Sequence, residues 1–398
     1  MTEARALAEQ TARASYGRLI ATIARVSGDI SAAEDALGDA LVAALKSWPE
    51  SGVPESPDAW LITTARRKSL NQARHAQVAT AAQPDLFLRA EETADASEFG
   101  DKRLELLFVC AHPAIDDRAR TPLMLQTVLG LSAERIAAAY AEDPKTLGQR
   151  LVRAKRKIKE AAVPFRVPDA DELTDRLPDV LHAIYGAFGQ GWDDPNTHLA
   201  SEACFLGDLL VNALPQEPET KGLLALMLFV EARRAARRTA YGAFIPLDRQ
   251  DPTLWNKSLL LRAEGLLQAA ARTKQPGRFQ LEAAIQSMHN SRAFGKDIDH
   301  QSLLHLHDTL LAIAPSLGAE VSRASVLISL GDMAGAETAL SAIDAKAAQT
   351  YQPYWVTHAE LARAKGLPCE DLAAKAIALT EDPALITYLS HRFTAAHV

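Results

Sequence analysis

The stretch from Leu129 to Ile158 decides how the surrounding chain folds, and its sequence is LGLSAERIAAAYAEDPKTLGQRLVRAKRKI. Ser132 is a good N-cap for a short helix, because its hydroxyl can accept a hydrogen bond from an amide of the first turn. Asp143 and Pro144 start a second helix, and Pro144 suits the first helical position because no amide hydrogen is needed there. Two helices around a tight turn predict a helix-turn-helix motif.

The second predicted helix has an apolar side and a basic side. The apolar residues recur at helical spacing: Leu147, Leu151, Ala154 and Ile158. The opposite side carries polar and basic residues, with the last of them at its edge: Lys145, Thr146, Gln149, Arg150, Arg153 and Lys157. Because the second helix of such a motif enters the major groove of DNA, we expect this side to face DNA. The alternative is an ordinary helical hairpin with a solvated basic face.

Composition places the chain in the all-α class. It has 398 residues, enough for two or three domains, and 48% of them are hydrophobic. Alanine and leucine are abundant, and runs of alternating Val, Ile and Thr are missing. No apolar run approaches the roughly 20 residues that cross a bilayer, and the first ten residues do not resemble a secretory signal. Three widely spaced cysteines suit reduced thiols, so we expect a cytoplasmic protein without membrane contact.

The net charge of −7 is not spread evenly along the chain. The first 162 residues carry 22 basic and 22 acidic side chains, whereas the remainder carries 21 and 28. All of the excess negative charge therefore belongs to the second part. In the first part the charges are sorted into blocks, and such blocks matter more for partners than their sum.

The N-terminal part contains an acidic block followed by a basic one. A predicted helical stretch over 17–44 carries Asp29, Glu34, Asp35 and Asp39. A loop with three prolines follows over 47–58, and then a predicted helix over 59–75. Six residues of this helix are candidates for DNA contact: Trp60, Arg66, Arg67, Lys68, Asn71 and Arg74. Trp60 has two interpretations, because it can stack on an unpaired base or pack in the core.

This order of blocks resembles a known bacterial family. An acidic helix, a proline-rich loop, the Ala59-Trp-Leu and Ala65-Arg-Arg-Lys helix, an acidic linker and the helix-turn-helix stretch are similar to an extracytoplasmic-function (ECF) sigma factor. The resemblance implies two small helical domains, region 2 over 1–76 and region 4 over 103–162, joined by an acidic linker over 77–102. The helix-turn-helix motif belongs to the second of these domains.

The same resemblance implies partners and roles. The run Ala32-Ala-Glu-Asp-Ala36 resembles the part that grips the β′ clamp helices of core RNA polymerase, and the β flap is a further expected contact. The carboxylates of Asp29, Glu34, Asp35 and Asp39 offer a surface to such a basic partner. The helix over 59–75 corresponds to the part that binds the downstream promoter element, and loop 47–58 to the part that captures a flipped-out base. The basic side of the second helix, starting at Lys145, is expected to bind the upstream element. The expected function is promoter-specific transcription initiation.

The remaining residues, 163–398, predict a helical-repeat domain. The run from Ala324 to Ile343 resembles a tetratricopeptide (TPR) unit, with Leu330-Gly-Asp-Met333 at its turn and a second partial match near Gly366. A subgroup of ECF sigma factors carries such a C-terminal domain. A longer helix is expected over 220–241, with a basic stripe formed by Arg233, Arg234, Arg237 and Arg238.

The C-terminal domain is expected to pack on the sigma domains and to regulate or support activity, and a regulatory protein or ligand is its expected partner. An inhibitory role in cis is the other possibility. For the whole chain the main alternative is a one-component helix-turn-helix regulator with a TPR-type sensor. A TPR scaffold with an incidental basic hairpin is the second alternative.

Enzyme chemistry finds little support in the sequence. No glycine-rich phosphate loop occurs, and no Cys or His set has the spacing of metal ligands. His305 and His307 lie two positions apart on a predicted helix and so point to different sides, although His300 and Asp308 are near in sequence. We therefore expect no catalytic residue, no metal site and no cofactor.

Overall fold

The computed structural model describes residues 3–78, 101–193 and 198–394. Within these ranges every regular element is helical, and the one β-type pairing is an isolated bridge between Arg238 and Phe244. The predicted all-α fold class is therefore confirmed. The chain divides into two compact units, Met1–Leu209 and Leu210–Val398, and each is described by itself. Most of the predicted linker over 77–102 lies outside the described residues.

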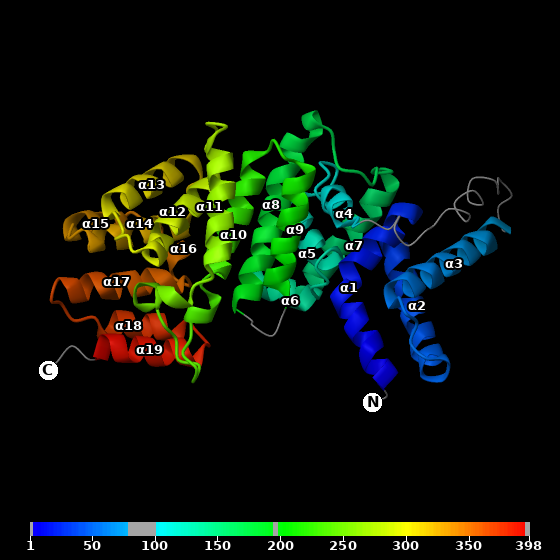
Figure 1. Ribbon diagram of the computed structural model, residues 1–398, viewed down its shortest axis with the longest axis horizontal. Coiled ribbons are helices and arrows are strands. Elements are labelled where there is room, and N and C mark those ends of the chain that lie inside the picture. The colour runs from blue at the N-terminus through cyan, green and yellow to red at the C-terminus, as the bar shows by residue number, and fades with distance from the viewer. Residues whose placement is uncertain (1–2, 79–100, 194–197, 395–398) are drawn as a thin grey trace. The chain divides into compact units, whose positions relative to one another are not determined.

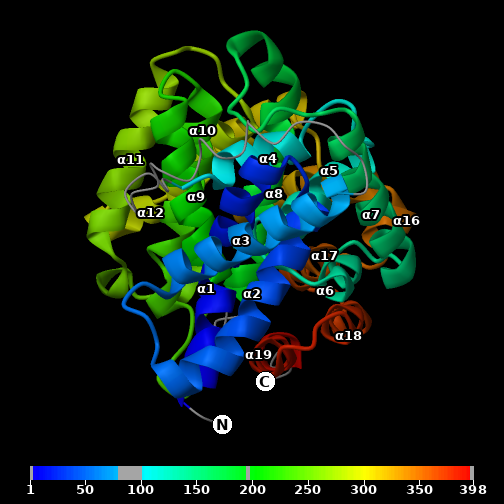
Figure 2. The same cartoon turned by 90° about the vertical axis from the view of Figure 1, so that its right-hand side faces the viewer.

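The first unit begins with a three-helix group. Its helices are α1 (Glu3–Ser27), α2 (Ile30–Ser51) and α3 (Pro57–Val78). Each packs against the other two, and Figures 1 and 2 show them as neighbouring blue helices. The shared interior is apolar and fully buried, with Leu19, Ile20, Ile23, Leu37 and Leu61 among its members. Burial of such side chains is the main favourable term in holding the group together.

Two boundaries in this group differ from the prediction. The helical stretch expected over 17–44 is broken, because Gly28 adopts a positive φ of 65° and Asp29 caps a new helix by accepting a hydrogen bond from the Ala32 amide. The loop expected over 47–58 is shorter, because α2 continues to Ser51. Trp48 is buried at 2% exposure, so packing extends the helix past the point where proline suggested an end.

The rest of the first unit contains α4 (Arg103–Cys110), α5 (Asp117–Thr127), α6 (Ala133–Ala139), α7 (Pro144–Glu160), α8 (Ala170–Asp193) and α9 (Leu199–Ala213), which crosses into the second unit. Both predicted helix starts of the helix-turn-helix stretch are confirmed. The Ser132 hydroxyl accepts from the Arg135 amide at 3.3 Å, and the Asp143 carboxylate accepts from the Thr146 amide at 2.7 Å. The buried side of α7 consists of the predicted apolar residues together with Lys155.

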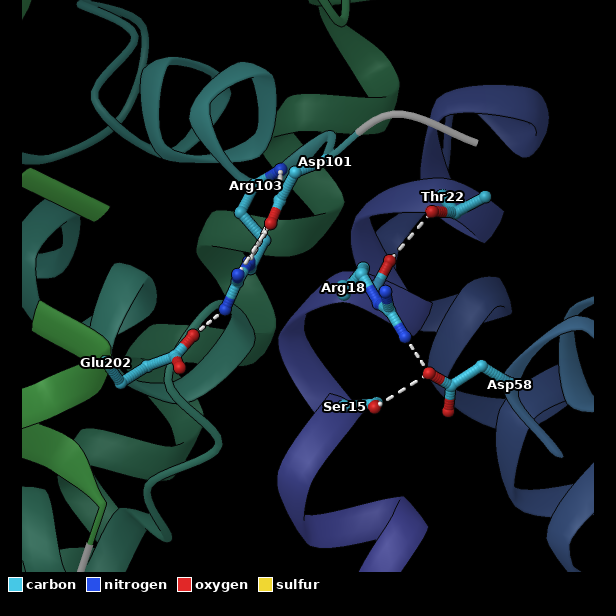
Figure 3. Close-up of polar contacts among 7 residues, drawn as sticks. All are labelled: Ser15, Arg18, Thr22, Asp58, Asp101, Arg103 and Glu202. Atoms are coloured by element: carbon cyan, nitrogen blue, oxygen red, sulfur yellow. Dashed lines mark hydrogen bonds and ion pairs between the residues drawn. The ribbon is translucent and has the colours of Figure 1, made fainter. Parts of the chain in front are cut away.

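Polar side chains fasten helices of the first unit to one another (Figure 3). The Arg18 guanidinium on α1 pairs with the Asp58 carboxylate in the first turn of α3, which also accepts from the Ser15 hydroxyl at 3.0 Å. Arg103 at the start of α4 pairs with Asp101 and with Glu202 on α9. Because α8 also packs on α4 and α5, this unit continues beyond residue 162. The predicted domain boundary at 162 and 163 stays a prediction.

The second unit is a series of packed helices. They are α10 (Pro218–Glu231), α11 (Lys257–Ala271), α12 (Arg278–Asn290), α13 (His300–Ile313), α14 (Leu317–Ser329), α15 (Met333–Ser341), α16 (Ala345–Ala348), α17 (Gln352–Ala364), α18 (Glu370–Ala378) and α19 (Pro383–Thr394). Neighbours in sequence are mostly neighbours in space, as for α17, α18 and α19 in Figure 1. The turn predicted at Leu330–Met333 is present, with Gly331 at a φ of 79° and Asp332 capping α15.

One helix of the second unit is shorter than predicted. The stretch over 220–241 was expected to be one helix, but α10 ends at Glu231. The Asn256 amide donates to the Ala232 carbonyl at 2.9 Å, so the chain returns to the end of α10 after an irregular excursion over 233–255. A backbone hydrogen bond between residues this far apart in sequence is invisible to local helix patterns.

Candidate functional site

The basic residues of α3 lie on a helix that is partly covered by its own domain. Arg67 is exposed, whereas Lys68 is half-buried and its Nζ lies 3.8 Å from the Asp39 carboxylate on α2. The Lys68 Nζ also donates to the Asp39 carbonyl at 2.9 Å. Two residues predicted for different partners therefore contact each other. Arg66 is half-buried on the same helix, and the side chains of Asn71 and Arg74 lie outside the described residues.

Trp60 at the start of α3 is half-buried against another tryptophan. Its ring and the buried ring of Trp48 have centroids 5.5 Å apart and meet edge to face at 69°. This contact agrees with the core interpretation of Trp60, and aromatic pairs of this geometry are favourable. Part of the Trp60 side chain remains accessible.

The side of α7 away from the domain interior presents a row of exposed polar and basic side chains: Lys145, Thr146, Gln149, Arg153 and Lys157. We call these five residues the outer side of α7. The Thr146 hydroxyl donates to the capping Asp143 carboxylate at 2.8 Å, and Arg153 donates to the Gln149 carbonyl at 3.3 Å. The row follows the helix axis, as a surface for the DNA groove must.

Arg150 differs from the rest of the predicted DNA-facing set. Its guanidinium forms a two-point contact with Glu142 in the turn before α7, at 2.9 and 3.2 Å, and donates to the Arg118 carbonyl at 3.3 Å. Only 20% of its side chain is exposed. Helical spacing predicted that Arg150 lies on the exposed side, whereas in the structure its side chain is already bonded within its own domain.

The four predicted polymerase-binding carboxylates, three on α2 and Asp29 at its N-cap, fall into three situations. Asp35 is exposed, and Asp39 is half-buried beside Lys68. Asp29 and Glu34 instead face α7. Glu34 accepts two hydrogen bonds from the Lys155 Nζ, at 2.6 and 2.8 Å, and Asp29 lies 2.8 Å from the Lys159 Nζ. We call these two ion pairs the α2–α7 contact.

Burial and hydrogen bonding set the ionisation of groups at the α2–α7 contact. Burial of the Asp29 carboxyl acts to raise its pKa, but hydrogen bonds from Lys159 and the Ala32 amide outweigh it, so the pKa is lowered. The hydrogen bond to Asp29 raises the pKa of Lys159. Burial, and next the charge of Glu34, raise the pKa of Tyr16, whose hydroxyl is hydrogen-bonded to Glu34. Each of these groups therefore keeps its ordinary charge near neutral pH.

Sequence patterns did not identify three members of this contact: Lys155, Lys159 and Tyr16. Position 155 follows Leu151 by four residues and precedes Ile158 by three, so it falls on the apolar side of α7. A lysine on an apolar side needs a carboxylate partner, because an unpaired buried charge is costly. That pattern was a usable signal for Lys155. No sequence pattern identified which carboxylate would meet it.

The second unit holds the basic stripe and the histidines noted in the sequence. Arg233 is buried and donates to Gln286 at 2.7 Å, and Arg238 pairs at 2.6 Å with Asp382, the residue before α19. Among those histidines, His307 is buried, and burial lowers its pKa. Across the described residues, no group of His, Cys, Asp and Glu is arranged to hold a metal ion, and no helix is long and apolar enough to span a membrane.

Comparison with known proteins places these features in a family. Residues 12–78, which cover most of α1 and all of α2 and α3, match Sigma-70 region 2, and residues 176–271 match a family of unknown function, DUF6596. The chain is 32% identical over 379 residues to an uncharacterized protein of Rhizobium meliloti (strain 1021), covering 91% of this chain and 89% of that protein. No solved structure matches. The chain belongs to the same family as the Rhizobium meliloti protein and contains a Sigma-70 region 2 domain followed by a helical C-terminal part.

Proposed function

We propose that this chain is a sigma factor of the ECF type that directs core RNA polymerase to specific promoters. The observation that carries the proposal is the combination of a region 2 match over α1–α3 with the exposed basic row on α7. A promoter-directing factor needs two separate DNA contacts, and helices α3 and α7 offer them. A simple repressor needs neither the acidic helix α2 nor a second DNA-facing helix.

The charges of the helices suit different binding partners. Among the four predicted polymerase-binding carboxylates, the exposed Asp35 suits the basic clamp helices of the polymerase β′ subunit. Arg67 on α3 and the outer side of α7 suit DNA phosphates and base edges of the downstream and upstream promoter elements. The helix-turn-helix domain would also contact the β flap. Because bacterial promoter DNA lies in the cytoplasm, the proposed location of the protein is the cytoplasm.

The C-terminal helices have a supporting role in this proposal. The hairpin of α14 and α15 closes around small buried residues, Ala324 and Ala336, as TPR-like units do. We propose that this helical array is required for full activity and binds a regulatory protein or ligand. Arrays of packed helix pairs present shaped surfaces suited to such a partner.

A gel-shift and transcription experiment with the full chain tests the function. The chain is mixed with a promoter library in the absence and in the presence of core RNA polymerase. We expect specific complexes and transcripts only when polymerase is present. Specific DNA binding without polymerase would support the one-component regulator, and no DNA response in either mixture would support a scaffold.

A further inference from the structure

The two predicted sigma domains meet through a closely fitted surface. Gly17 on α1 lies against the end of α5, where any Cβ on residue 17 would collide with the Val128 carbonyl oxygen. Gly130, at a φ of 67°, lies against the Tyr16 ring, and Arg25 pairs with Glu105 at 3.0 Å. Such close backbone approach indicates a specific arrangement of the two domains and not a nonspecific contact.

The ion pairs of the α2–α7 contact are part of this surface. Lys155 is only 8% exposed and Glu34 is 25% exposed, so both give up much of their hydration where they meet. The Tyr16 hydroxyl adds a third group to Glu34. Loss of hydration is compensated only by good geometry and further hydrogen bonds, and this cluster supplies both. The contact is therefore a specific one between α2 and α7.

The same two carboxylates are half of the set proposed to bind polymerase. We infer that the free chain holds itself in a closed arrangement, in which Lys155 and Lys159 of α7 occupy Glu34 and Asp29, and that polymerase binds α2 only after displacing α7. This inference rests on the proposed function. A carboxylate held at 2.6 and 2.8 Å by a buried lysine is not available to a clamp helix.

The closed arrangement controls polymerase binding rather than DNA contact. The outer side of α7 stays exposed in it, and so does Asp35 on α2. Asp35 therefore offers a first contact to a basic partner, while Asp29 and Glu34 become available when α7 leaves. A closed form that greatly outnumbers the open one weakens the apparent affinity by the fraction that is open.

Zero-length cross-linking of the unmodified full chain detects the closed arrangement directly. A carbodiimide joins a lysine amine to a carboxylate that it contacts, with loss of water. Lys159 and Asp29 are the best pair, because the Lys159 side chain is 65% exposed and the two groups lie 2.8 Å apart. We expect an intrachain Lys159–Asp29 link in the free monomer and its loss when core polymerase is added. Lys157, on the outer side of α7, is the internal control and gives no link to α2.

A matched pair of variants measures the consequence for binding. Lys155→Met combined with Lys159→Met removes both ion pairs while leaving the outer side of α7 and all α2 carboxylates intact. The control is Arg156→Met, which removes a positive charge from the exposed Arg156–Glu160 pair within α7. If closed chains outnumber open ones about a hundred to one, the double variant binds core polymerase up to about a hundredfold more tightly and the control is unchanged.

Four outcomes would overturn the inference, and they are distinct. Absence of the link in the free chain shows that no closed form exists. Persistence of the link in the polymerase complex, or unchanged affinity of the double variant, shows that α7 does not withhold α2, and the proposed function survives. If neither the unmodified chain nor any variant binds polymerase, while every chain that retains Lys159 forms the link, then the proposed function is wrong and the inference is wrong with it.

Discussion

The basic helices α3 and α7 each provide a lysine to a carboxylate of α2, but at different depths. Lys68 of α3 and Asp39 lie 3.8 Å apart, with 37% and 50% of their side chains exposed. Lys155 of α7 and Glu34 lie 2.6 Å apart, with 8% and 25% exposed. Exposed pairs contribute little to stability, whereas breaking a buried pair leaves a charge without solvation or a partner.

This difference separates a pair that a partner can displace cheaply from one that resists displacement. Lys68 can exchange Asp39 for a DNA phosphate at little cost, because solvent already reaches both groups. Lys155 cannot leave Glu34 unless α7 moves as a whole and both groups become hydrated. The first arrangement suits direct competition, and the second suits a conformational change.

The largest effect is expected from deleting the buried lysine. Lys155→Ala should lower the free energy of unfolding of the first unit by about 3 kcal/mol, because Glu34 loses its charged partner. Lys68→Ala is the matched control and should change it by less than about 0.5 kcal/mol. Urea unfolding, with hydrogen exchange in α2 and α7 as the probe, measures the change in the free energy of unfolding for both variants. Equal losses in the two variants would remove the distinction between the helices.

A second change breaks the fit around the α2–α7 contact without altering charge. Gly17→Ala should destabilise the first unit by about 2 kcal/mol, because the added methyl group meets the Val128 backbone, which cannot rotate away. Gly38→Ala in α2 should stabilise it by about 0.5–1 kcal/mol, since nothing lies within 4 Å and alanine is the better helix former. The same unfolding measurement applies, and opposite signs are the expected result.

The outer side of α7 should affect DNA binding and not stability. Arg153→Ala should weaken binding of the polymerase complex to its promoter by about 1 kcal/mol and relax preference at one upstream position, the lower end of the range for a base contact. Lys157→Ala should weaken all sequences alike and reduce the salt slope by roughly one unit. Arg150→Ala should weaken DNA binding less than these two variants, because the Arg150 side chain is already bonded to Glu142. Gel shifts over a salt series distinguish the three variants, and an equal loss from Arg150→Ala would contradict the assignment.

The smallest effect concerns pH. The folded-state pKa of Asp29 lies below its ordinary 3.8, so its stabilising contribution is present above pH 3.8 and is lost as pH falls through the folded value. The pKa of Lys159 is raised above 10.5, so its contribution is present below pH 10.5 and is lost as pH rises through the folded value. The pair is therefore complete across neutral pH. Asp29→Asn should reduce the loss of stability between pH 6 and pH 3, and Lys159→Ala should reduce it in part.

Sequence patterns succeeded where the determinants are local. Ser132, Asp143 and Pro144 each act within a few residues of their own position, and the helices begin where these residues predicted. The break at Gly28 and Asp29 was missed because the apolar spacing continues through it. Its local signals, a glycine able to adopt a positive φ and a capping aspartate, were present in the sequence.

The candidate site was harder to predict because its contacts are distant in sequence. Lys155 and Glu34 are 121 positions apart, so no local pattern joins them. The early end of α10 has a similar origin, since Ala232 is fixed by the Asn256 amide. Arg150 was placed on the exposed side by helical spacing alone, whereas the carboxylate of Glu142 in the preceding turn draws it inward.

The end of α3 and the start of α4 have a consequence for the competition between α7 and polymerase. Helix α3 ends at Val78, and Arg103 fastens the start of α4 to Asp101 and Glu202, so α2 and α7 belong to one continuous chain. Groups on one chain meet at an effective concentration that dilution does not change. Reclosing is then unimolecular and independent of protein concentration, so polymerase competes with α7 as with a ligand that dilution never removes.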